Sequence, residues 1–169
     1  MHTPLTIESL NPLWPARQRL AYDELLANQL AIQLLRRRVR RSPGLSIAGN
    51  DHLRGQVINS LPFSLTKSQL QALKDIDDDM FTEWRMVRLL HGDVGSGKTI
   101  VAFLAMLKAV ESGGQSALMA PTEILAQQHF KTIAALAETI GISCSLLSGR
   151  IKPDSRKKIL ADLGKGKII

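Results

Sequence analysis

The apolar positions in the first quarter of the chain follow the spacing of one helical face. These positions are Leu20, Leu25, Leu26, Leu30, Leu34 and Leu35. Such a stripe predicts an amphipathic helix. Pro15 suits a first helical turn, and Ser42-Pro43-Gly44 is typical of a helix end. We therefore predict a long helical arm from about Pro15 to Arg41, followed by a glycine-containing loop at about residues 42–60.

From Leu61 onward, the pattern alternates between short apolar runs and longer amphipathic segments. The apolar runs predict strands at residues 86–90, 117–120 and 143–147, and a fourth strand opening at residue 168. The longer segments predict helices at about residues 66–80, 98–111 and 122–139, and one that opens at Pro153. Strands that alternate with crossover helices indicate an α/β fold with a parallel sheet and right-handed connections.

The pattern predicts two parts. Residues 1–60 form a helical linker arm and loop, and residues 61–169 form an incomplete α/β domain with a parallel sheet. Because the sequence stops at the opening of the fourth predicted strand, we expect the chain to be a fragment of something longer.

Composition narrows the setting and the class of partner. The net charge of +7 favours a polyanion such as nucleic acid. The single cysteine, Cys144, rules out a disulfide framework within the chain and fits a reducing compartment. No apolar run approaches the ~20 residues that span a bilayer, and the N-terminus lacks the features of a signal peptide. We expect a cytoplasmic protein.

One loop carries recognisable chemistry. The sequence Gly92-Asp93-Val94-Gly95-Ser96-Gly97-Lys98-Thr99 fits the P-loop pattern and lies between a predicted strand and a predicted helix. Gly95 and Gly97 let successive backbone N–H groups point at phosphate oxygens. Lys98 would reach the β- and γ-phosphates, and Thr99 would ligate Mg²⁺. The loop therefore predicts ATP and Mg²⁺ as cofactors.

The helix before the first strand has two interpretations. Thr66 and Gln69 have the spacing of a capping box. The Gln69 amide could instead read adenine, because it donates and accepts at once, and Phe63 could stack on the base. The sequence leaves both interpretations open.

Two further features bear on nucleic acid. Thr122 opens a helix whose free N–H groups could bind a backbone phosphate, although a plain N-cap is the better explanation of Thr122 taken alone. The arginines of the run at residues 36–41 could contact phosphates or form a solvated helix end. They are Arg36, Arg37, Arg38, Arg40 and Arg41.

A P-loop by itself does not identify the function, since kinases, GTPases and nucleic-acid motors share it. A small-molecule kinase would need a substrate pocket or lid after the second strand. A non-catalytic, basic DNA-binding module with a vestigial loop is a further alternative, which the intact Lys98-Thr99 pair disfavours.

The motifs together resemble a known family. GDVGSGKT after MVRLL, with APTEILAQQH and LLSGR, resembles the first motor lobe of the RecG family of bacterial branch-migrating DNA helicases in superfamily 2. The stretch RLAYDELLANQLAIQLLRRR resembles that family's linker helix. The resemblance implies that residues 61–169 are the N-terminal part of an incomplete P-loop NTPase (RecA-like) half-domain, the family's first helicase lobe. The motor of the transcription-repair coupling factor is similar but usually has TTLLAQQH, so Glu123 and Ile124 favour the RecG family.

The resemblance implies a role for each motif. Residues 92–99 would bind the ATP phosphates, and Phe63 and Gln69 would form the adenine-side motif. The DNA backbone would run along Pro121, Thr122, Glu123, Ser148 and Gly149. The implied substrate is branched DNA, such as stalled forks and Holliday junctions, in recombination and repair. The implied location is the bacterial cytoplasm, associated with the nucleoid.

Several parts that the family uses for ATP hydrolysis and DNA binding are not found in this sequence. The family's acidic DE-type motif, its DNA-binding wedge domain and its second motor lobe do not occur in this sequence. Asp77-Asp78-Asp79 lies before the P-loop strand and does not replace the acidic motif. Because phosphoryl transfer needs these parts, we expect the chain alone to bind nucleotide but not to sustain hydrolysis or unwind DNA.

Overall fold

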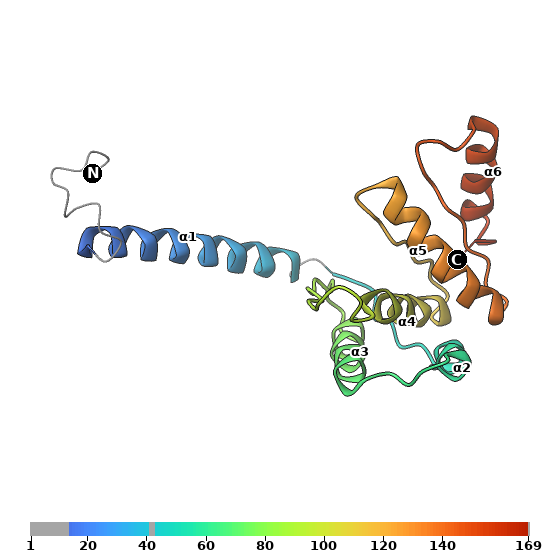
Figure 1. The fold of residues 1–169 in the computed structure, drawn as a ribbon, viewed down its shortest axis with the longest axis horizontal. Helices are drawn as coiled ribbons and strands as arrows, with labels where there is room; N and C mark the ends of the chain where they lie inside the picture. The colour runs from blue at the N-terminus through green and yellow to red at the C-terminus, as the bar shows by residue number, and fades with distance from the viewer. Residues whose placement is uncertain (1–13, 41–42, 169) are drawn as a thin grey trace. The chain divides into compact units, whose positions relative to one another are not determined.

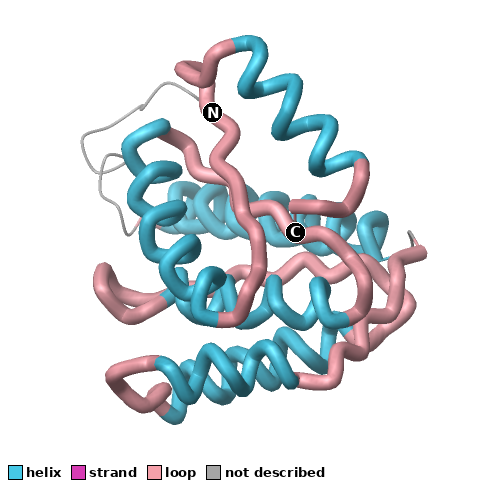
Figure 2. The backbone as a smooth tube through the Cα atoms, turned by 90° about the vertical axis from the view of Figure 1, so that its right-hand side faces the viewer, coloured by secondary structure: helices cyan, strands magenta, loops and turns pink. Residues whose placement is uncertain are grey.

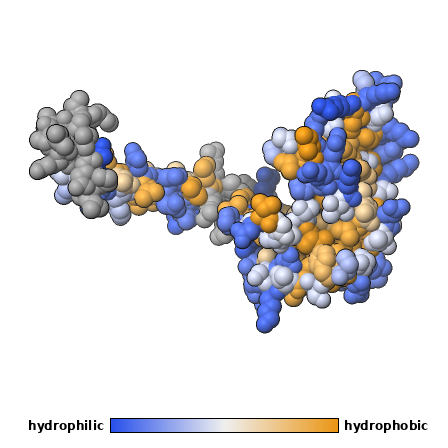
Figure 3. Space-filling model, in the orientation of Figure 1, coloured by the Kyte–Doolittle hydropathy of each residue, from blue (hydrophilic) through white to orange (hydrophobic). Residues whose placement is uncertain are grey.

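The computed structural model describes residues 14–40 and 43–168, which fall into two compact units, Met1–Pro43 and Gly44–Ile169. The first unit contains helix α1, Pro15–Arg40. Leu25, Leu30 and Leu34 of this helix are exposed, and Figure 3 shows apolar side chains along it. The predicted long helix is therefore present up to Arg40, whereas Arg41 and Ser42 lie outside the described residues.

The second unit contains five helices among its described residues (Figure 1). They are α2 (His52–Ser60), α3 (Lys67–Met80), α4 (Lys98–Glu111), α5 (Glu123–Thr139) and α6 (Pro153–Gly164). The periodicity predicted α3, α4, α5 and α6, and these predictions are confirmed to within a residue or two.

Helix α2 corrects the sequence analysis, which expected a loop up to Ser60. Its start is stabilised from a distance by Glu111 at the end of α4. The Glu111 carboxylate accepts hydrogen bonds from the backbone N–H groups of Asp51 at 2.8 Å and of Leu53 at 2.6 Å. A carboxylate there satisfies free N–H groups and complements the helix dipole. Local sequence patterns do not reveal such a partner.

Helix α4 forms the centre of the core of the second unit. Val101, Leu104 and Leu107 of α4 are almost completely buried. They pack with Val57 of α2 and with Leu73, Ile76 and Met80 of α3, while Ile133 and Ala137 of α5 complete the cluster. This packing fixes the start of α4, and therefore the end of the predicted P-loop.

The predicted parallel sheet is not formed in the described residues (Figure 2). Residues 86–90, 117–120 and 143–147 run as loops, and no recorded backbone hydrogen bond joins them to one another. Strands are stabilised by pairing with neighbours, so apolar runs without paired backbone groups do not become strands. Val87, Leu89 and Met119 are accordingly exposed.

The contacts place α2 in the second unit, because it packs against α4 and α5. The division between units thus falls after Pro43, whereas the sequence placed its domain boundary after residue 60. None of the helices in residues 14–40 and 43–168 combines the length and the apolar character needed to cross a membrane.

Candidate nucleotide-binding loop and its surroundings

The predicted P-loop turns sharply just before α4. Gly95 has a φ of 82° and Gly97 a φ of 80°, in the left-handed region where side chains are rarely found. A Cβ atom on Gly97 would also displace the side-chain amide of Gln69, although the positive φ is what requires glycine there. The turn is closed by a hydrogen bond from the Ser96 N–H to the Asp93 carbonyl oxygen at 3.2 Å. The glycines therefore determine the shape of the loop.

Lys98 folds back over the loop that precedes it. Its ammonium group donates to the carbonyl oxygen of Gly92 at 2.7 Å and to that of Asp93 at 2.6 Å. The positive charge consequently lies against the backbone of the loop, where an anion held by that loop would meet it.

Several backbone N–H groups at this corner make no bond to the backbone. Among residues 43–168, no such hydrogen bond is recorded for the N–H groups of Gly95, Gly97, Lys98 or Thr99. The last two belong to the first turn of α4, where N–H groups have no partner within the helix. Free N–H groups, a helix N-terminus and a lysine together fit a phosphate group.

Thr99 lies next to α5. Its hydroxyl Oγ1 is 3.4 Å from Nδ1 of His129, and both residues are partly buried. The sequence analysis identified Thr99 but gave His129 no role. Only the tertiary structure brings these residues together, since 30 positions separate them in the chain. No group of three or more His, Cys, Asp or Glu side chains suited to a metal occurs in the described part of the chain.

Gln69 connects α3 to the loop. Its Oε1 accepts from the Thr66 N–H at 2.8 Å, and Thr66 Oγ1 accepts from the Gln69 N–H at 3.2 Å. The capping box is therefore formed. The other end of the amide, Nε2, donates to the Ser96 carbonyl oxygen at 2.9 Å.

Phe63 is exposed and lines an open hollow of about 460 Å³ between the end of α2 and the start of α3. Leu61, Leu65 and Leu70 also line this hollow, whereas Gln69 does not. Phe63 and Gln69, the two predicted adenine-side residues, therefore lie in different surroundings. Phe63 lines the hollow, whereas Gln69 contacts the P-loop.

The five residues predicted to follow the DNA backbone come from two segments that meet. Thr122 caps α5, accepting from the Leu125 N–H at 3.3 Å. Glu123 forms an ion pair with Arg150 at 2.8 Å, and a Cβ atom on Gly149 would lie 3.3 Å from Glu123 Oε1. Pro121 and Thr122 are exposed, and Ser148 is partly buried. The APTEILAQQH and LLSGR motifs therefore lie side by side at the start of α5.

The acidic run at the end of α3 has a structural role. Asp77 accepts two hydrogen bonds from the Arg54 guanidinium, at 2.6 and 2.8 Å, and pairs with Lys108 at 3.3 Å. Burial raises the pKa of Asp77, but the hydrogen bonds and charges of Arg54 and Lys108 outweigh it, so the pKa lies below its ordinary value. Asp79 pairs with Arg88 at 2.7 Å.

Arg54 is buried, and the sequence analysis did not single it out. Burial lowers its pKa, but the hydrogen bond and charge of Asp77, with the charges of Asp51 and Glu111, raise it overall. Arg54 also donates to the Leu104 carbonyl oxygen at 3.2 Å. The sequence did contain a signal for this, because Arg54 lies between the apolar residues Leu53 and Val57. A cation in such a segment needs a charged partner if it is buried.

The arginine run lies at the end of α1. Arg37 is exposed, and residues 36–40 are helical. Arg41, and the side chains of Arg36, Arg38 and Arg40, lie outside what the structure describes.

Comparison with known proteins identifies similar sequences and a similar structure. The DEAD/DEAH box helicase family matches residues 66–169. ATP-dependent DNA helicase RecG of Bacillus subtilis (strain 168) is 43% identical over 169 residues, covering 99% of this chain and 24% of the relative. The RecG of Thermotoga maritima is 43% identical over 168 residues, covering 99% of this chain and 21% of the relative.

A solved structure described as "Structure of RecG bound to three-way DNA junction" matches with a TM-score of 0.79 and 42% identity, over 96% of this chain and 22% of that one. The chain therefore spans less than a quarter of the length of these relatives. These matches imply a P-loop helicase fold, although the described residues are helical and form no strand.

Proposed function

Because the chain belongs to the DEAD/DEAH box helicase family, we propose that it is part of the first motor lobe of an ATP-dependent DNA helicase of the RecG kind. In this proposal the loop at residues 92–99 binds ATP with Mg²⁺. The observation that carries the proposal is the loop itself, in which two left-handed glycines, free N–H groups and the Lys98 ammonium converge at the start of α4.

The residues present fit the phosphates of a nucleotide. The N–H groups of Gly95, Gly97, Lys98 and Thr99 would donate to phosphate oxygens, and Lys98 would exchange its carbonyl partners for the β- and γ-phosphates. The Thr99 hydroxyl would ligate Mg²⁺. When bound, ATP supplies the phosphoryl bond whose hydrolysis drives a helicase.

Branched DNA is the substrate that we propose for the parent protein. A structurally similar RecG is described as bound to a three-way DNA junction. In this chain, the exposed start of α5 and the neighbouring Ser148-Gly149 segment would contact the DNA backbone. Remodelling of stalled forks and Holliday junctions, in recombination and repair, is then the proposed outcome of ATP turnover in the parent protein.

The domain assignment is also a proposal. We assign residues 61–169 to the motor lobe and the long helix α1 to a linker arm. The packing of α2 on α4 and α5 supports adding residues 44–60 to the lobe.

The proposal predicts that Lys98→Ala abolishes nucleotide binding. Without the ammonium group, the β- and γ-phosphates lose their principal cation. We expect affinity to fall by at least about tenfold, so that no saturable binding is seen over the concentrations at which the unaltered chain saturates. Titration of a fluorescent ATP analogue against the chain measures this. Lys74→Ala is the matched control, because Lys74 is exposed on α3 and has no recorded partner in the described residues. Saturable binding that survives Lys98→Ala would contradict the proposal.

A further inference from the structure

One polar contact connects the two helices that carry the proposed nucleotide and DNA sites. Thr99 belongs to the first turn of α4, and His129 lies about two turns into α5, whose start carries Thr122 and Glu123. The 3.4 Å separation between Thr99 Oγ1 and His129 Nδ1 is long for a hydrogen bond, so a small approach of the helices would tighten it. Elsewhere, α5 meets the core through apolar side chains such as Ile133 and Ala137.

We propose that His129 is a positioning residue that orients the Thr99 hydroxyl for Mg²⁺. The inference rests on the proposed function and deepens it. A threonine hydroxyl that gives an oxygen lone pair to a metal keeps its proton, and that proton needs an acceptor. Nδ1 of a neutral imidazole protonated on Nε2 is such an acceptor. A hydrogen bond from Thr99 Oγ1 to Nδ1 turns the free lone pairs of the hydroxyl away from α5.

The surroundings of His129 favour this role over simple packing. The Nδ1 atom of His129 faces a hydroxyl, and the ring is only partly buried. No hydrogen bond to a second side chain is recorded for His129 within residues 43–168. Partners of metal ligands typically change metal affinity by about tenfold or more when they are removed.

The position of His129 has a consequence for coupling. A shift of α5 caused by DNA at Thr122 and Glu123 would move His129 relative to Thr99, because a helix moves as a rigid element. His129 would thereby connect occupancy of the DNA backbone site with the geometry of the Mg²⁺ ligand through contiguous contacts.

The test measures how far Mg²⁺ strengthens nucleotide binding. A fluorescent ATP analogue is titrated against the chain in MgCl₂ and again in EDTA. The readout is the dissociation constant in EDTA divided by the dissociation constant in MgCl₂. We expect His129→Ala to reduce this ratio by about tenfold and to leave binding in EDTA unchanged. His129→Asn places an amide near the position of Nδ1 and should restore most of the ratio. Gln128→Ala, at the exposed neighbouring position, should leave it unchanged.

The outcomes separate this inference from the proposed function. An unchanged ratio in His129→Ala, with Lys98→Ala still abolishing binding, overturns the inference alone. Equal weakening in MgCl₂ and EDTA also overturns it, since that indicates a purely structural role. If His129→Ala does not fold, His129→Phe fills the same space without a nitrogen atom and decides the question in the same way. Absence of any binding by the unaltered, folded chain overturns both proposals.

Discussion

Gln69 uses both ends of its amide within the protein. Its Oε1 completes the capping box of α3, while Nε2 bonds to Ser96 in the loop. An amide that read adenine would have to give up at least one of these bonds. At the scale of single residues, the structure therefore supports the capping interpretation and adds a connection to the loop that the sequence did not indicate.

We expect Gln69→Ala to lower the free energy of unfolding by about 1 kcal/mol, because the capping box and the bond to Ser96 are lost. We also expect it to weaken ATP and GTP binding equally, since it acts through the shape of the loop. Thermal unfolding and parallel titrations with ATP and GTP analogues measure this. Gln71→Ala is the control, because the exposed Gln71 amide donates to Asp75 of the same helix at 2.8 Å and does not reach the loop. A loss confined to ATP would instead favour recognition of adenine by Gln69.

At the scale of elements, one charged cluster holds three helices together. Arg54 of α2, Asp77 of α3 and Lys108 of α4 meet, with Asp51 completing the cluster. Side-chain bonds of this kind are directional, unlike the apolar contacts around them, so they fix how the helices are oriented. The cluster consequently supports the helix that begins at the P-loop.

The cluster makes stability depend on pH in a defined direction. The folded pKa of Asp77 is lowered, so its contribution to stability is present above its unfolded pKa of about 3.9 and is lost as pH falls through the folded value. We expect Asp77→Asn to cost about 2 kcal/mol at neutral pH and to flatten the loss of stability in acid. Chemical unfolding at pH values from 7 down to 3 measures both effects.

Asp78→Asn is the matched control, because Asp78 is the exposed neighbour of Asp77 on α3. It should follow the acid profile of the unaltered chain. If Asp77→Asn loses stability in acid as steeply as the unaltered chain does, Asp77 does not carry the dependence.

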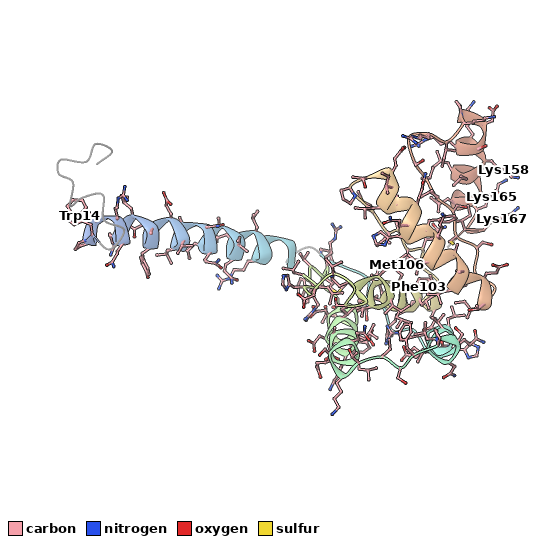
Figure 4. The ribbon with its side chains drawn as sticks, viewed as in Figure 1. Trp14, Phe103, Met106, Lys158, Lys165 and Lys167 are labelled. Atoms are coloured by element: carbon pink, nitrogen blue, oxygen red, sulfur yellow. The ribbon has the colours of Figure 1, made fainter. Side chains whose placement is uncertain are left out.

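At the scale of the whole molecule, the chain carries a net charge of +7. Lys158 lies on α6, and Lys165 and Lys167 follow its end (Figure 4). Lys158 and Lys167 also line an open hollow of about 740 Å³ together with Glu138 of α5. No ion pair is recorded for these three lysines in the part of the chain that the structure describes. Unpaired cations favour a polyanion and make its binding depend on salt. This charge distribution agrees with DNA as the proposed partner.

We expect Thr122→Val to weaken binding to a three-way DNA junction by about three- to tenfold, because the start of α5 loses a donor to the backbone. Fluorescence anisotropy at a fixed salt concentration measures the affinity. Thr122→Ser keeps the hydroxyl and the helix cap, so it should bind as the unaltered chain does. Unchanged affinity in a folded Thr122→Val chain would remove Thr122 from the proposed DNA site.

The sequence by itself determined the features that depend on neighbouring residues. The helices α1, α3, α4, α5 and α6 follow from apolar periodicity and from their caps, and the turn at Gly95 and Gly97 follows from the residues that a tight loop requires. These features were predicted because their causes lie within a few positions along the chain.

Only the tertiary structure decided the features whose partners are distant in sequence. Helix α2 forms with Glu111 capping it, Arg54 is buried against Asp77, and His129 meets Thr99. The predicted strands are not formed in residues 43–168 for the same physical reason, because a strand depends on backbone partners that its own sequence does not contain. Local pattern therefore determined the helices and the loop, whereas long-range pairing decided what surrounds them.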